Sequence, residues 1–171
     1  MTFTSPKAVL LIRNPTAGRG RRGLVDAVVR HVRAAGWTVD LVDTAAIGDA
    51  RRLAESCDAS RYAVIAVAGG DGTINEVVNG LSRRSEGAPP LAIVPLGTAN
   101  VLAYELGLDF KATSLAHTIM SNHAVLMHPG EAIESGDPRC FSLMAGANFD
   151  AKVVTNVNAR LKHRLNKATY V

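Results

Sequence analysis

Cysteines and long apolar runs are scarce in this sequence of 171 residues. Its two cysteines, Cys57 and Cys140, lack the spacing of a metal or redox motif, which argues against a disulfide framework. No apolar run approaches the roughly 20 residues of a transmembrane helix, and residues 1–7 lack the apolar core of a signal peptide. These absences predict a cytoplasmic protein with reduced thiols and no transmembrane segment.

Aromatic residues are also few, at 5% of the chain. The formal net charge is +4, and basic residues gather within residues 19–22 and 160–167. No aromatic side chains alternate with them, as they do where nucleic-acid bases stack, so a nucleic-acid partner is not expected. Peripheral contact with an anionic membrane surface remains open.

Three common catalytic motifs are missing. The histidines show no H-E-x-x-H spacing, no G-x-S-x-G motif offers a serine nucleophile, and no G-x-x-x-x-G-K-[ST] motif forms a P-loop. These absences argue against a histidine zinc site, against acyl transfer through such a serine, and against a P-loop enzyme.

Apolar segments and amphipathic segments alternate through residues 1–125. An apolar run over residues 62–68 predicts a strand that is buried on both faces, and residues 8–13 also read as a buried strand. Two further strands are predicted at residues 37–42 and 91–94. Helical spacing of apolar residues predicts helices between and after these strands, with Asp49 capping the second helix and Leu106 facing inward in the fourth. Gly36 and Gly107 are expected to end helices. The alternation predicts a three-layer α/β fold, with helices on both faces of a parallel sheet.

The pattern changes after about residue 122. Residues 124–128 and 141–145 resemble strands, and the polar residues 129–139 join them without a helix. We therefore expect an α/β nucleotide-binding domain over residues 1–125 and a β-rich second domain from residue 126 to 171. Because about 45 residues give only a small core, the chain is expected to end inside this second domain.

The most informative motif follows the third predicted strand and opens a helix; it reads Gly69-Gly70-Asp71-Gly72-Thr73-Ile74-Asn75-Glu76. Glycine N–H groups at such a turn, together with the helix dipole, favour a phosphate. Asp71 would repel a bare phosphate, so we expect it to hold a metal ion, a metal-bound water or a proton. This combination predicts phosphoryl transfer with Mg²⁺ and with Asp71 as the catalytic residue. The alternative is a tight turn in which Asp71 caps the helix and Glu76 only compensates its dipole.

Two further loops link strands to helices in the same way. Asn14-Pro15-Thr16-Ala17-Gly18 follows the first strand, and Pro95-Leu96-Gly97-Thr98-Ala99-Asn100 follows the fourth. Thr98 offers a hydroxyl to a phosphate, while Asn100 bridges to the second loop or only caps its helix. Ligands of parallel sheets bind beyond the carboxyl ends of the strands, so the three loops predict one site.

A dinucleotide-binding pattern also occurs in the first loop. Residues 18–23 satisfy G-x-G-x-x-G, and Asp43 stands twenty positions after the last glycine. In that fingerprint the first glycine follows the strand directly, whereas four residues intervene here. We favour a loop in which Asn14, Thr16 and the glycines face a nucleotide, with the arginines near its phosphates. A hydride-transfer site and a basic surface turn are the alternatives.

Residues 69–81 closely resemble the signature of the diacylglycerol kinase catalytic-domain family, which includes bacterial lipid kinases and their sphingosine and ceramide kinase relatives. The likeness extends to residues 14–18, 95–100 and 145–151. It implies ATP-dependent phosphorylation of a lipid hydroxyl, such as that of diacylglycerol, at a membrane surface. ATP and Mg²⁺ would lie between the α/β domain and a C-terminal β-sandwich.

The resemblance also implies which residues contact ATP: those of the three loops and Thr44, which matches a family threonine on the nucleotide side. They are Asn14, Thr16, Thr44, Gly69, Gly70, Asp71, Gly72, Thr73, Ile74, Asn75, Glu76, Gly97, Thr98 and Asn100. No metal ligand is assigned to this chain, apart from Asp71 acting through ATP-bound Mg²⁺.

The chain departs from the family pattern in places. Many members carry an aspartate where this chain has Val101, and glycine is frequent where it has Asn148 and Asn166. Asparagine is the next most tolerant residue of a left-handed backbone, so these two positions are expected to keep their conformation. The general base and structural metal ligands of the family are expected beyond residue 171.

Other functions stay open at this point. A kinase acting on NAD shares a Gly-Gly-Asp-Gly loop, although residues 75–80 and 97–100 favour a lipid substrate. A nucleotide-binding module without catalysis is a further alternative, because the second domain is incomplete. Neither the identity of the lipid nor the formation of a homo-oligomer follows from the sequence.

Overall fold

The computed structural model describes residues 6–18, 21–84, 87–121, 123–134 and 137–143. In these residues four strands form one parallel sheet in the order β2-β1-β3-β4. The strands are β1 (Ala8–Arg13), β2 (Thr38–Asp43), β3 (Val64–Gly69) and β4 (Leu91–Pro95). Every residue of β3 is buried, as expected of a central strand that is covered on both faces.

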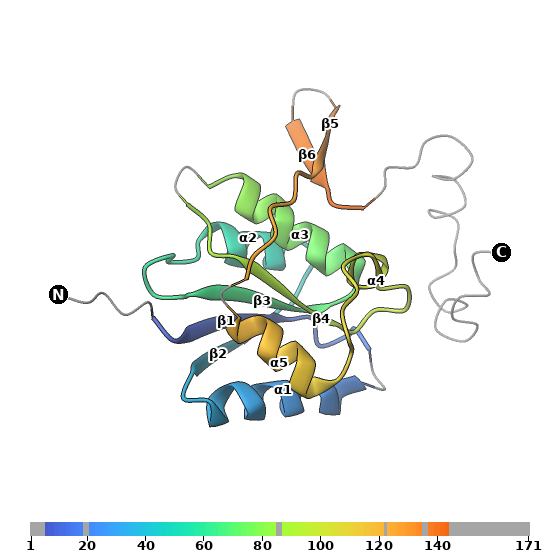
Figure 1. Ribbon diagram of the computed structural model, residues 1–171. Coiled ribbons are helices and arrows are strands. Elements are labelled where there is room, and N and C mark those ends of the chain that lie inside the picture. The colour runs from blue at the N-terminus through green and yellow to red at the C-terminus, as the bar shows by residue number, and fades with distance from the viewer. Residues whose placement is uncertain (1–5, 19–20, 85–86, 122, 135–136, 144–171) are drawn as a thin grey trace.

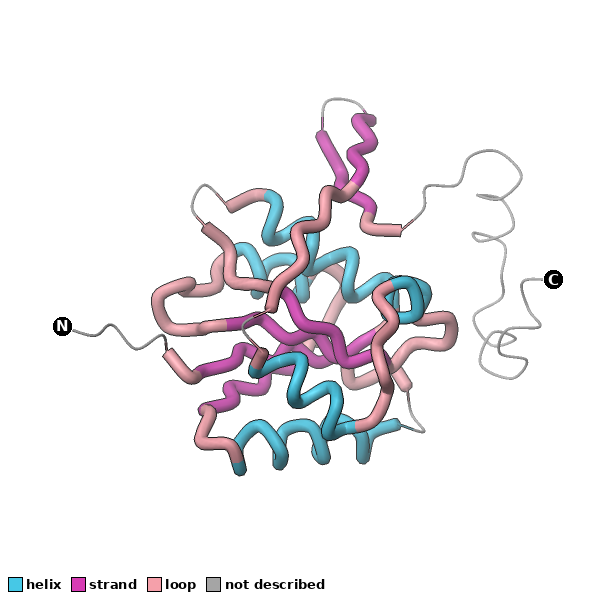
Figure 2. Tube along the Cα trace, viewed as in Figure 1, coloured by secondary structure: helices cyan, strands magenta, loops and turns pink. Residues whose placement is uncertain are grey.

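Helices cover both faces of this sheet (Figure 1). The first face carries α1 (Arg22–Ala34) and α5 (Ala112–Met120), and the second carries α2 (Asp49–Glu55) and α3 (Asp71–Ser82). The short α4 (Val101–Glu105) packs into the hydrophobic core between the sheet and the second pair of helices, α2 and α3. Figure 2 shows the strands as one layer between the helices, which confirms the predicted three-layer α/β fold.

The strand order creates a crevice at one edge of the sheet. The chain leaves β1 to form β2 on one side, and then returns to form β3 on the other side of β1. The connections that follow β1 and β3 therefore diverge, and such a switch point is where parallel α/β sheets bind ligands. Asn14 and Gly70 are the first residues beyond the carboxyl ends of these two strands.

Two predicted details of the helices are wrong. Leu106 is 47% exposed, because α4 ends at Glu105 and the helical period does not continue to the next residue. Asp49 does not cap α2; Gly48 holds the N-cap position with φ of +88°, and Asp49 begins the helix. The predicted stops at Gly36 and Gly107 are confirmed, since both have left-handed φ angles.

The strands predicted for the β-rich region are misplaced. Residues 124–128 form no strand, and residues 129–139, predicted as a connection, hold β5 (Gly130–Glu134) and most of β6 (Asp137–Phe141). These two strands pair antiparallel, and residues 144 and 145 lie outside the described residues. The apolar run misled the prediction, because Val125 and Leu126 are 86% and 82% exposed. The domain boundary at residue 126 stays a prediction.

Candidate functional site

Asn14 links the loop after β1 to the loop after β3 across the crevice. Its backbone N–H donates to the Ala68 carbonyl at 2.9 Å, which continues the ladder beyond β1. Its side-chain Nδ2 donates to Thr73 Oγ1 at 3.1 Å. Its Oδ1 accepts from the Thr16 N–H at 3.0 Å and from the Thr16 hydroxyl at 2.8 Å. One amide therefore orients the hydroxyls of both threonines.

The loops after β3 and β4 meet backbone to backbone at Gly70 and Gly97, a contact that we call the glycine seam. A Cβ atom on Gly97 would lie 2.6 Å from Gly70 Cα and 2.9 Å from Asn100 Oδ1. The Leu96 N–H also donates to the Gly69 carbonyl at 2.9 Å. Because no side chain fits between such backbones, glycine is required at the seam.

Asn100 stands beside this seam and is buried, with 1% of its surface exposed. Its backbone is left-handed, with φ of +50°, and its Nδ2 donates to the Gly97 carbonyl at 2.8 Å. Within the described residues no donor meets its Oδ1. A buried oxygen without a donor costs about 1–3 kcal/mol, so Oδ1 indicates a place where a donor from a bound group is expected.

No side chain of the described residues caps the N-terminus of α3. Gly70 is its N-cap residue, and the N–H groups of the next three residues have no partner within the helix because they belong to its first turn. Gly72 is exposed there. Uncapped N–H groups and the positive end of the helix dipole form an anion-binding arrangement.

Asp71 lies in this first turn and is partly buried. Its Oδ1 accepts from the Leu102 N–H of α4 at 3.4 Å, which is long for a hydrogen bond. The contact orients the Asp71 carboxylate toward the loop after β4 (residues 95–100), and the carboxylate can still accept further hydrogen bonds. Val101, where many family members carry aspartate, is the first residue of α4.

The loop of residues 44–48 borders the crevice from the side of β2. Its backbone is held by two carboxylates: Asp49 Oδ2 accepts from the Ala45 and Ala46 N–H groups at 2.8 and 3.0 Å, and Glu76 Oε2 accepts from the Gly48 N–H at 3.0 Å. We call this segment the 44–48 loop. These bonds fix its conformation and occupy N–H groups that would otherwise bind an anion.

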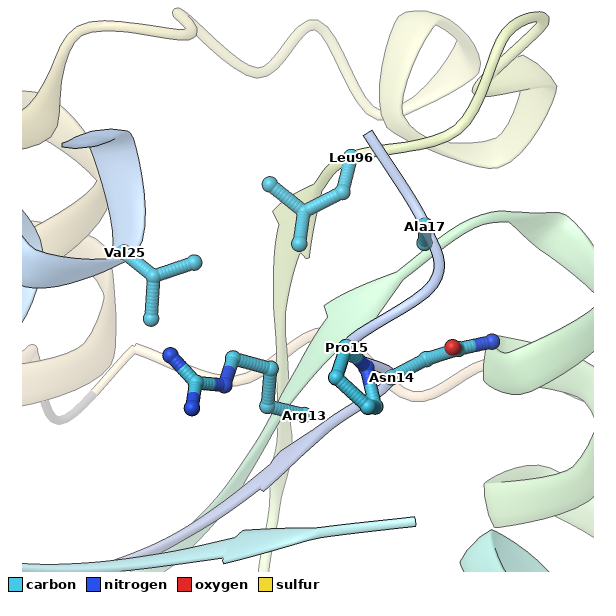
Figure 3. A pocket seen from close by; sticks show the side chains of 6 residues that line it. All are labelled: Arg13, Asn14, Pro15, Ala17, Val25 and Leu96. Atoms are coloured by element: carbon cyan, nitrogen blue, oxygen red, sulfur yellow. The ribbon is translucent and has the colours of Figure 1, made fainter. Parts of the chain in front are cut away.

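Cavities lie on both sides of Asn14. The Thr73 cavity, of about 240 Å³, is lined by Asn14, Thr16, Thr44, Ala45, Ala46, Ile47, Thr73 and Glu76. The Val25 cavity, of about 270 Å³, is lined by Arg13, Asn14, Pro15, Ala17, Val25 and Leu96. Figure 3 shows the Arg13 side chain turned toward Val25 of α1 and the Asn14 side chain turned away from it.

The smaller Thr73 cavity is the better candidate site. It gathers hydroxyls and a carboxylate from three segments of the chain and reaches the first turn of α3. The described walls of the Val25 cavity are mostly apolar, and Arg13, which lines it, already forms an ion pair by donating twice to Asp43 at 2.6 and 2.8 Å. That pair lowers the pKa of the Asp43 carboxyl.

Two side chains of the predicted site, those of Ile74 and Asn75, face away from the crevice, and a third residue is exposed to solvent. The Ile74 side chain is fully buried in the core, so only its backbone can meet a ligand. Asn75 Oδ1 accepts from the Ser142 N–H at 3.2 Å and from its hydroxyl at 3.4 Å, so this amide faces the chain after β6. Thr98 is exposed beyond the glycine seam.

The sequence analysis missed Asn79, a buried residue of α3. Its Nδ2 donates to the Cys140 carbonyl at 2.8 Å, and its Oδ1 accepts from the Cys140 N–H at 2.9 Å. The Asn79 amide thus makes the two backbone hydrogen bonds that a neighbouring strand would make with β6. These bonds attach the hairpin of β5 and β6 to α3, above which it lies in Figure 1. The spacing of Asn75 and Asn79 on one helix face was the signal that the sequence offered.

Asn79→Ala is expected to detach the hairpin from α3. Both main-chain groups of Cys140 lose their partner, which costs about 1–3 kcal/mol in the local opening free energy. Hydrogen exchange should show faster exchange at the Cys140 amide, while the amides of β3 keep their protection. Unchanged protection at Cys140 would show that the hairpin is held by other contacts.

Asp49 is expected to contribute to the acid dependence of stability. The Arg52 guanidinium, followed by the Ala45 and Ala46 N–H groups, lowers the pKa of this carboxyl from 3.8 to about 2. Because the folded state lowers the pKa, the charged carboxylate stabilises the fold above about pH 4, and this contribution is lost as the pH falls toward about 2. Thermal unfolding of Asp49→Asn should therefore depend less on pH in that window. Asp26→Asn, on an exposed position of α1, is the control; an equal slope in all three proteins would contradict the assignment.

The fold defines a class of proteins: doubly wound α/β domains in which the N-terminus of a helix lies at the switch point of the sheet. Within this class, the chain belongs to the diacylglycerol kinase catalytic domain family, whose model matches residues 8–132.

Similar proteins carry lipid kinase names. A Pseudomonas aeruginosa PAO1 protein named "Probable lipid kinase YegS-like" is 34% identical over 167 residues, which are 96% of this chain and 52% of that protein. A Staphylococcus aureus JH9 protein named "Diacylglycerol kinase" is 34% identical over 127 residues, 73% of this chain and 40% of that protein. The chain thus spans about half the length of the curated relatives that it matches, or less.

A solved structure agrees with this relationship. The crystal structure of a diacylglycerol kinase from Bacillus anthracis str. Sterne matches with a TM-score of 0.60 and 34% identity, over 75% of this chain and 46% of that one. Within the described part of this chain, no helix has both the length and the hydrophobicity that crossing a membrane requires.

Proposed function

We propose that this domain binds ATP with Mg²⁺ and serves the transfer of the γ-phosphoryl group to a lipid hydroxyl, such as that of diacylglycerol. The glycine seam carries the proposal, because it joins the loop after β4 to the N-terminus of α3, which no side chain of the described residues caps. Family membership and the names of the relatives support a lipid as the acceptor.

The chain supplies positioning and charge. The N–H groups of the first turn of α3 and the hydroxyls of Thr73 and Thr98 would hold the phosphates, and Asn14 orients the Thr73 hydroxyl. Asp71 would hold a metal-bound water or the proton of the attacking hydroxyl. Bound ATP with Mg²⁺ supplies the phosphoryl group and neutralises its charge. Thr16, Thr44 and Glu76 would contact the nucleotide from the Thr73 cavity.

The metal would enter with ATP. Among the described residues, no three carboxylate, histidine or cysteine side chains come together as a metal site of the chain itself would require. We place the lipid at a membrane surface to which the domain binds peripherally, in the cytoplasm.

The direct test uses γ-labelled ATP, Mg²⁺, the full chain and vesicles that contain diacylglycerol. Label that partitions into the organic extract supports the proposal. With NAD present, label in a water-soluble dinucleotide would instead identify a kinase acting on NAD. Saturable ATP binding without any transfer would identify a nucleotide-binding module that lacks catalysis.

A further inference from the structure

We propose that Asn75 and Asn79 couple the phosphate end of α3 to the hairpin of β5 and β6, so that nucleotide binding tightens the attachment of the hairpin. Both asparagines are positioning residues in this role, because their side chains face the hairpin and not the crevice. The inference rests on the proposed function, which places the phosphates on the first turn of α3.

The two side-chain amides pair with the backbone of the hairpin and of the chain that follows it. Asn79 is buried and bonds to both main-chain groups of Cys140, at 2.8 and 2.9 Å. Asn75 Oδ1 accepts from the N–H and the hydroxyl of Ser142, at 3.2 and 3.4 Å. Two residues of an extended chain span about 6.6 Å, and four residues of a helix span about 6 Å. The spacing of the two asparagines therefore matches alternate backbone positions along the hairpin strand.

The hairpin is thereby attached to the residue that closes the first turn of α3. Because the helix begins at Asp71, the Asn75 N–H donates to the Asp71 carbonyl in the first turn. Asn79 Nδ2 donates to the Asn75 carbonyl at 2.8 Å as well as to the Cys140 carbonyl. The first turn, the two amides and the hairpin thus form one continuous chain of hydrogen bonds.

A phosphate on the first turn stabilises this chain of hydrogen bonds at its free end. The ends of helices open locally, because their terminal N–H groups lack partners within the helix. An anion binds these groups and complements the helix dipole. When the turn opens, Asn75 is displaced and Ser142 loses its acceptor. A ligand that favours the closed turn therefore favours the attached hairpin, and by linkage the attached hairpin raises the affinity for ATP.

The experiment measures amide hydrogen exchange at Ser142 in the full chain, with and without ATP and Mg²⁺. ATP should slow this exchange about fivefold in the unmodified chain, which is the lower end of the usual coupling between two sites. In Asn75→Ala the Ser142 N–H has no acceptor, so saturating ATP should no longer slow its exchange. The matched control is Ser82→Ala, which changes an exposed residue of the same helix and keeps both amides. It should behave as the unmodified chain does.

Aspartate variants test whether the amides act through these bonds. Asn75 only accepts from Ser142, so Asn75→Asp should keep the slow exchange of Ser142 that the unmodified chain shows without ATP. Asn79 both donates and accepts at Cys140, so Asn79→Asp should speed exchange at Cys140, since a carboxylate repels its carbonyl. Exchange at Ser142 as fast in Asn75→Asp as in Asn75→Ala would overturn the role of Asn75.

Reciprocity gives a second measurement and separates this inference from the proposed function. By calorimetry, Asn79→Ala should bind ATP about fivefold more weakly than the unmodified chain, the same factor by which ATP slows exchange. ATP binding that leaves Ser142 exchange unchanged in the unmodified chain would overturn the inference alone, as would equal ATP affinity in Asn79→Ala. Absence of ATP binding by the unmodified chain would overturn both.

Discussion

Asp71→Asn is expected to lower phosphoryl transfer by about 10²- to 10⁴-fold, the usual size of a proton-transfer contribution. The asparagine keeps the size of the side chain and can still accept from the Leu102 N–H, so the third loop keeps its contact with α3. It loses the charge that would hold a proton or a metal-bound water. Transfer of label from ATP to the organic extract measures the effect.

The control for this substitution is Asp26→Asn, which makes the same chemical change on an exposed position of α1. Both variants should unfold within a few degrees of the unmodified chain, because neither aspartate is fully buried. Wild-type turnover in Asp71→Asn would end the assignment of Asp71 as the catalytic residue.

Gly97→Ala is expected to open the glycine seam. The added Cβ would lie 2.6 Å from Gly70 Cα, so one of the two backbones must move. Displacement of about 1 Å in a group that positions substrate can cost about 10²-fold in rate, and overpacking costs about 1–3 kcal/mol in stability. We therefore expect both a loss of ATP affinity and a loss of turnover, measured by calorimetry and by label transfer.

The matched control is Gly87→Ala, an exposed glycine around which no atom lies within 4 Å of an added Cβ. It should bind ATP as the unmodified chain does. If Gly97→Ala bound ATP as tightly as Gly87→Ala, the close approach of Gly70 and Gly97 would have no part in the site.

Three strands of the sheet, β1, β3 and β4, are mostly or fully buried, and this burial made them predictable from the sequence. β3 is apolar along its whole length for this reason, and such runs need no knowledge of their neighbours. The prediction for the region after α5 was wrong because apolar character alone does not create a strand. Residues 124–128 pair with no strand in the part of the chain that the structure describes, whereas β5 and β6 pair through backbone bonds that their polar side chains do not reveal. The two residues between them, Ser135 and Gly136, were the available hairpin signal.

The site was predictable in outline for a topological reason. Loops that follow parallel strands meet at one edge, so the convergence of the three loops followed from the strand pattern. The contacts between the loops are tertiary, so the strand pattern of the sequence does not predict them. The pairing of Asn14 with Thr73 and the seam of Gly70 with Gly97 join residues that are far apart in the sequence. The sequence around Asn75 likewise does not predict that its side chain faces Ser142.

The position of the nucleotide is the central claim, and a titration of the ¹⁵N-labelled full chain with ATP and Mg²⁺ tests it most directly. The account predicts the largest amide shift changes at Gly70–Thr73, at Gly97 and in the 44–48 loop, on both sides of the Thr73 cavity. Changes centred on Ala17 and Val25, around the other cavity, with the first turn of α3 unaffected, would contradict it.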